Sequence, residues 1–143
     1  MEIREFMTKE HRACDEEFAK VENFVNEGDF SNALAEFMKF KDHTLKHFAQ
    51  EEELLFVEFK EATGMSGGPV EVMTFEHNQM RGIIEQITQA LSEKNSDEFF
   101  GLSDAFMITI QQHNMKEEQM LYNMMQQVLG ARNDELVGKL EVF

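Results

Sequence analysis

Apolar residues return every three or four positions along most of the 143-residue chain. This spacing places apolar side chains on one face of an α-helix, whereas a half-buried strand would alternate apolar and polar residues. The pattern is clearest in two sets of residues: Phe37, Phe40, Thr44, Leu45, Phe48 and Leu55, and Phe106, Ile110, Met115, Leu121 and Met125. Since only one proline interrupts the chain, the pattern predicts an all-α protein.

Glycine, proline and helix-capping residues divide the pattern into four long helices. We expect helices over residues 3–27, 29–63, 69–94 and 96–130, and the remainder, ARNDELVGKLEVF, can form a short C-terminal helix. The expected ends are Gly28, Gly64 and Gly130, and the expected starts are Asp29 or Ser31, then Pro69, then Ser96 or Asp97. Short connections make neighbouring helices antiparallel, so we predict a single domain, residues 1–143, folded as an up-down-up-down four-helix bundle.

Composition and charge narrow the classes of function. The formal net charge of −15, from 28 acidic and 13 basic residues, repels phosphate, so we expect no nucleic acid and no membrane surface as partners. No apolar run is long enough to span a bilayer, and the start of the chain does not read as a signal peptide. A single cysteine fits a reducing compartment, so we expect a cytoplasmic protein. The sequence names no protein partner.

The chain also repeats itself. A shift of 66 residues places one half on the other, so that each half is a helical hairpin reading EH and then HxxxEE. The matched pairs are His11 with His77, His47 with His113, Glu51 with Glu117, Glu10 with Glu76, Glu52 with Glu118, Leu55 with Leu121, and Phe56 with Tyr122. Two related hairpins that pack together have approximate twofold symmetry, and their matched residues can meet at the centre of the bundle.

The repeated HxxxE pairs predict a metal site. Residues four apart share one helix face, so each pair aims an imidazole and a carboxylate in one direction, and apolar neighbours such as Phe48, Leu54 and Met115 indicate that this face points inward. Burying these groups without partners would cost several kcal/mol each. A lone histidine is more often structural, but the repeated set favours non-haem iron. The predicted ligands are His11, His47, Glu51, His77, His113 and Glu117.

The order His, HxxxE, His, HxxxE over four helices resembles the hemerythrin-like family, also described as the HHE cation-binding domain. The resemblance covers about residues 3–129 and includes the flanking EH pairs and the EExxLF/Y tails. It implies a left-handed four-helix bundle that holds two iron ions (Fe2+/Fe3+) joined by an oxo or hydroxo bridge. By position, it implies His11 and His47 on one iron, His77 and His113 on the other, and Glu51 and Glu117 as bridges.

The chain departs from the oxygen-carrying members at one position. Those members have a further histidine four residues before the one that matches His77, where this chain has Met73. Its counterpart in the first half is Met7. The resemblance therefore implies a more symmetric and more open site, which argues against simple reversible carriage of O2.

Several other side chains have more than one interpretation. His43, outside the repeat and one turn before His47, can be a fifth imidazole ligand, a hydrogen-bonding residue behind the ligands, or an ordinary polar position. Cys14 is expected to be a buried, inert thiol, although it can also face the cluster. The Tyr122 hydroxyl can reach a bridging carboxylate or point to water. Glu52 and Glu118, the residues after the two bridges, are expected to be solvated.

The first interpretation of function is a non-haem di-iron protein that binds or senses a small diatomic, O2 or NO, or responds to iron and redox state. The second is an enzyme, with peroxidase-like or NO-reducing turnover, or a protein that delivers iron to damaged centres. The third is a structural bundle in which the metal only joins the two hairpins. The sequence leaves open whether the protein is an enzyme.

Overall fold

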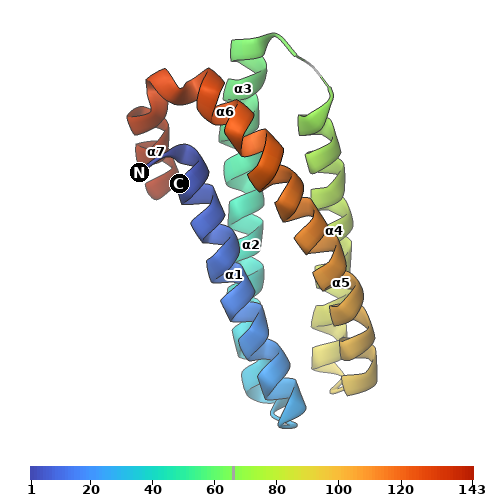
Figure 1. Cartoon of the computed structure of the whole chain (residues 1–143). Helices are drawn as coiled ribbons and strands as arrows, with labels where there is room; N and C mark the ends of the chain where they lie inside the picture. Colours follow the sequence, from blue (N-terminus) through green and yellow to red (C-terminus); the bar gives the residue numbers. More distant parts are fainter. Residues whose placement is uncertain (66) are drawn as a thin grey trace.

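The computed structural model describes residues 1–65 and 67–143, and it shows four long antiparallel helical rods (Figure 1). No strand occurs in this part of the chain, so the predicted all-α bundle is confirmed. The rods are α1 (Ile3–Asn26); α2 (Phe30–Gln50), η1 (Glu51–Leu55) and α3 (Phe56–Thr63); α4 (Pro69–Ser92); and α5 (Ser96–Lys116), η2 (Glu117–Leu121) and α6 (Tyr122–Leu129). The short η3 (Gly130–Arg132) leads to α7 (Asn133–Glu141), the predicted C-terminal helix.

Local chemistry accounts for most of the helix ends. The Asp29 carboxylate accepts a hydrogen bond of 3.1 Å from the Asn32 backbone N–H and so caps α2, as predicted. Gly64 ends α3 in the left-handed region at φ 70°, which a residue without a Cβ adopts easily. The prediction that Ser96 or Asp97 caps the fourth rod is wrong, because the Asn95 side chain accepts from the Glu98 N–H at 3.0 Å and so caps a helix whose first residue is Ser96. Between the expected helices 29–63 and 69–94, Ser66 lies outside the described residues.

The second and fourth rods each contain one π-helical turn, which the sequence pattern did not reveal. The first turn begins at Glu51 and the second at Glu117, which the 66-residue repeat relates to each other. A π turn is a rare local widening of the helix that is frequent at functional sites. Both turns therefore mark the two acidic residues that the sequence singles out.

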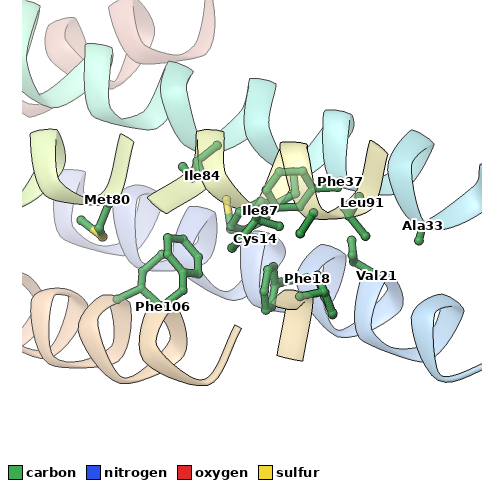
Figure 2. Close-up of a cluster of buried hydrophobic side chains, with 14 of the residues drawn as sticks. Cys14, Phe18, Val21, Ala33, Phe37, Met80, Ile84, Ile87, Leu91 and Phe106 are labelled. Atoms are coloured by element: carbon green, nitrogen blue, oxygen red, sulfur yellow. The ribbon is translucent and has the colours of Figure 1, made fainter. Parts of the chain in front are cut away.

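The apolar core consists of two clusters at opposite ends of the bundle. The first is rich in Phe rings, among them Phe18, Phe37 and Phe106 (Figure 2). The centroid of the Phe18 ring lies 5.1 Å from that of Phe40 and 5.5 Å from that of Phe106. The second lies where α7 covers the end of the bundle, with Leu136 and Leu140 among its members. His11, His77, His113 and both central Glu residues fall between the two clusters along their rods, and His47 is next to Phe48 of the first cluster. No helix in the described part of the chain is both long and apolar enough to cross a membrane.

Candidate metal centre

The structure brings all six predicted ligands together inside the bundle, between the two apolar clusters. They come from α1, α4, α5, the end of α2 and the two π turns. All six are at least 96% buried: His11, His47, Glu51, His77, His113 and Glu117. Met115 was expected to help bury this region, but its side chain is 55% exposed because it lies two residues from His113 and therefore on another face of α5.

The ligand atoms form two groups that share one carboxylate. In each group, one ligand atom of every residue lies within 4.8 Å of the others. The first group is Glu51, His77, His113 and Glu117, and the second is His11, His47 and Glu117. Glu117 Oε1 lies 3.1 Å from His11 Nε2 and 3.2 Å from His113 Nε2. Glu51 Oε1 lies 3.1 Å from His77 Nε2 and 3.5 Å from His47 Nε2. Each carboxylate therefore lies between imidazoles of the two halves.

Unsatisfied atoms in this centre fit a cation. Four ligand atoms are fully buried and have no hydrogen-bond partner within residues 1–65 and 67–143: Glu51 Oε1, His77 Nε2, His113 Nε2 and Glu117 Oε2. Glu51 Oε1 and His77 Nε2 lie 3.1 Å apart, but their contact does not have the geometry of a hydrogen bond. Buried polar atoms are normally paired, so a cluster of unpaired ones needs an explanation. Imidazole nitrogens and carboxylate oxygens are ligands of divalent transition metals, and iron is among the metals they suit.

Burial and close charges shift the pKa values of the cluster in opposite directions. Burial alone would lower the pKa of His11 and of His77, but hydrogen bonds and charges from carboxylates outweigh it and raise the pKa to about 9 and about 10. Burial holds the pKa of His47 well below its ordinary value. Burial and the neighbouring Glu117 raise the pKa of Glu51, whereas contacts with Glu51 and two imidazoles lower that of Glu117 against the effect of burial. Glu117 is therefore the anionic centre of the cluster.

Carboxylates also lie behind three of the four imidazoles. The Nδ1 contacts are His11 with Glu118 at 2.7 Å, His77 with Glu52 at 2.5 Å, and His113 with Glu76 at 2.9 Å. The expectation that Glu52 and Glu118 are solvated is wrong, because each turns toward a neighbouring helix and also pairs with an arginine, Arg81 or Arg12. Such contacts fix the orientation of a ligating imidazole and raise its basicity. In the sequence, the second Glu of each HxxxEE stretch was the feature that could have predicted the contacts of Glu52 and Glu118.

The structure does not bring His43 to the six ligands. Its Nδ1 lies 2.8 Å from Glu17 Oε1, and its Nε2 contacts Glu10 Oε2, so both ring nitrogens face carboxylates. With Glu17 and Cys14 it forms a separate, partly buried group beside the centre. Burial raises the pKa of the Cys14 thiol to about 12, and Thr44 donates a hydrogen bond to its sulfur, in keeping with the expected inert thiol.

Tyr122 places its hydroxyl in the middle of the centre. The oxygen lies 2.9 Å from Glu51 Oε2 and 3.1 Å from Glu117 Oε1, and the side chain is fully buried. The same oxygen lies 3.1 Å from His11 Nε2 and 3.3 Å from His47 Nε2. Of the two interpretations of this residue, the structure therefore supports contact with the carboxylates.

Comparison with known proteins adds one finding. The family model described as the hemerythrin HHE cation binding domain matches residues 2–125, which is most of the chain. No curated protein and no solved structure gave a match.

Proposed function

Because the chain belongs to the hemerythrin HHE cation-binding family, we propose that its buried centre holds two iron ions, joined by an oxo or hydroxo bridge, and binds or senses a small diatomic there, O2 or NO. The observation that carries the proposal is Glu117, which is shared by two ligand groups that each contain two imidazoles. His11 and His47 would hold one ion, and His77 and His113 the other, with Glu51 and Glu117 between them. Iron in such a ligand set supplies electrons and open coordination positions for a diatomic or for a response to redox state.

The protein's own residues prepare the centre for this role. Carboxylates at Nδ1 hold three of the imidazoles in the tautomer that leaves Nε2 free to face the centre. The Phe48 ring stacks on His77, with centroids 4.0 Å apart and an angle of 14° between the planes. Met7 and Met73 fill the positions one turn before His11 and His77, and both are buried. These apolar side chains keep bulk water from the centre.

Tyr122 favours a second candidate function. Its O–H can donate to either central carboxylate, at 2.9 Å and 3.1 Å, so a proton can be held or moved within a site that excludes water. Reduction of peroxide or NO consumes protons, and a buried donor beside the ligands suits such turnover. The second candidate is therefore a di-iron enzyme with peroxidase-like or NO-reducing activity.

The test is anaerobic reconstitution with Fe2+, followed by a metal count and by optical spectra after addition of O2 and of NO. We expect two irons per chain and new absorption bands with at least one of the two gases. Glu53→Gln is a matched control, because Glu53 lies in the same π turn as Glu51 but is exposed. Repeated consumption of peroxide or NO would select the enzyme. Folded protein that holds one iron or none would refute the di-iron proposal.

A further inference from the structure

The two halves of the centre differ in the contact that one imidazole makes through its Nδ1. In the second half, Glu76 Oε1 lies 2.9 Å from His113 Nδ1. The 66-residue repeat places Glu10 and His47 at the corresponding positions of the first half. There, however, His47 Nδ1 is buried and has no hydrogen-bond partner in the part of the chain that the structure describes. His47 is thus the one imidazole of the four without a carboxylate behind it.

His43 accounts for this difference. Its Nε2 contacts Glu10 Oε2, and Glu17 holds its Nδ1 at 2.8 Å, so the ring is clamped between two carboxylates. The repeat places Thr109 opposite His43, and the Thr109 hydroxyl only donates back to the Ala105 carbonyl of its own helix at 3.0 Å. In the second half Lys116 contacts Glu76 Oε2, but Glu76 Oε1 still lies on His113 Nδ1, so this contact does not draw the carboxylate away from the imidazole. In the first half an imidazole, His43, binds the corresponding carboxylate instead.

We infer that His43 is a positioning residue that makes the two metal positions unequal by drawing Glu10 away from His47. A carboxylate on Nδ1 raises the basicity of an imidazole and fixes its ring, and loss of such a contact typically weakens metal binding about 10- to 100-fold. The position served by His11 and His47 therefore binds a divalent metal more weakly than the position served by His77 and His113. This inference rests on the proposed two-metal centre.

The two metal affinities of the parent protein are not a sufficient test, because the metal position of His11 and His47 differs from the other position in a second way. The Tyr122 hydroxyl is 3.1 Å from His11 Nε2 and 3.3 Å from His47 Nε2, whereas the repeat places Phe56 opposite Tyr122. A difference between the two binding steps can therefore come from the phenol as well. The contribution of Glu10 is isolated by a double-mutant cycle on the His43–Glu10 pair.

The first experiment is competition of Zn2+ between the protein and a chelator of known affinity, resolved into two binding constants. We expect His43→Thr to free Glu10 for His47 and to tighten the weaker step by about 10-fold or more. The gain should disappear in His43→Thr/Glu10→Gln. Glu76→Gln is the matched change in the other half and should weaken the tighter step. A His43→Thr protein with an unchanged weaker step, or a gain that persists without Glu10, would overturn the inference.

The second experiment needs no substitution. Long-range 1H–15N spectra of the Zn2+-loaded parent, with ligating histidines assigned, should show hydrogen-bonded, slowly exchanging Nδ1–H protons on His11, His77 and His113 and a faster-exchanging one on His47. A protected His47 Nδ1–H in the parent would overturn the inference even if His43→Thr failed to fold. Failure to bind two Zn2+ ions would instead refute the two-metal centre, so the two failures are distinguishable.

Discussion

Glu117 belongs to both ligand groups and Glu51 to only one, so replacing Glu117 should reduce metal binding more than replacing Glu51. Glu117→Gln keeps the side-chain volume and an oxygen that can accept from Tyr122, but it removes the negative charge. The second ligand group is then left with His11 and His47 alone, whereas the first keeps His77, His113 and Glu51. We expect Glu117→Gln to bind one metal per chain. Glu51→Gln leaves three donors in each group, so we expect it to retain two metals with lower affinity.

The expected loss of stability follows from metal binding. A metal present at 100 times its dissociation constant stabilises the folded protein by about 2.7 kcal/mol. For a chain of this size, 1 kcal/mol corresponds to about 4 °C in melting temperature. Loss of one metal position in Glu117→Gln should therefore lower the melting temperature of the loaded protein by roughly 10 °C. The metal-free forms will also differ, because Glu117 helps to raise the pKa of His11 and of His77, so the contribution of the metal is the additional loss in the loaded protein.

The assay is a metal count on desalted protein together with thermal unfolding at fixed excess Zn2+ and in chelator. Glu53→Gln serves as the control, since this exposed neighbour of Glu51 lies outside both ligand groups. A Glu117→Gln protein that holds two metals with the affinity of the parent would refute the shared position of Glu117. Equal losses in Glu51→Gln and Glu117→Gln would refute the unequal division of ligands.

Three further predictions concern pH, Tyr122 and Met73. The pKa values of His11, about 9, and His77, about 10, lie above the ordinary 6.5, so the stability they contribute is complete below about pH 6.5 and is lost as pH rises through 9 and 10. The free energy of unfolding of metal-free protein, measured with a denaturant, should therefore fall between pH 7 and 10 by up to about 2.7 kcal/mol per pH unit. A free energy that rises with pH would contradict this. Tyr122→Phe leaves Glu51 Oε2 without its donor and removes one of the donors to Glu117 Oε1, so it should lower stability by about 1–3 kcal/mol in the same unfolding experiment. An unchanged stability would argue against the hydroxyl contacts. Met73→His places an imidazole one turn before His77. When reduced protein is mixed with O2 in a stopped-flow experiment, the absorption bands that appear should decay more slowly than in the parent. Equal decay would show that the missing histidine at position 73 does not control the lifetime of the O2 complex.

The sequence by itself determined the helical rods and which residues share a face. Its apolar spacing and its glycines placed the ends of the first three rods within about two residues, because periodicity and capping are local properties of the chain. The 66-residue repeat singled out six residues that the structure brings together. This was within reach of the sequence because HxxxE spacing fixes a direction on a helix, and because two related hairpins must pack face to face.

Tertiary structure decided which side chains lie opposite one another. Glu52 and Glu118 were expected in water, yet each reaches across to an imidazole on a neighbouring helix. The π turns, the division of ligands around Glu117 and the pairing of His43 with Glu10 were likewise not predicted. Spacing along a helix reports the face on which a residue lies, but a hydrogen bond across the bundle depends on the relative height and rotation of two helices. Those are set by the packing of the whole core, to which residues far apart in the chain contribute.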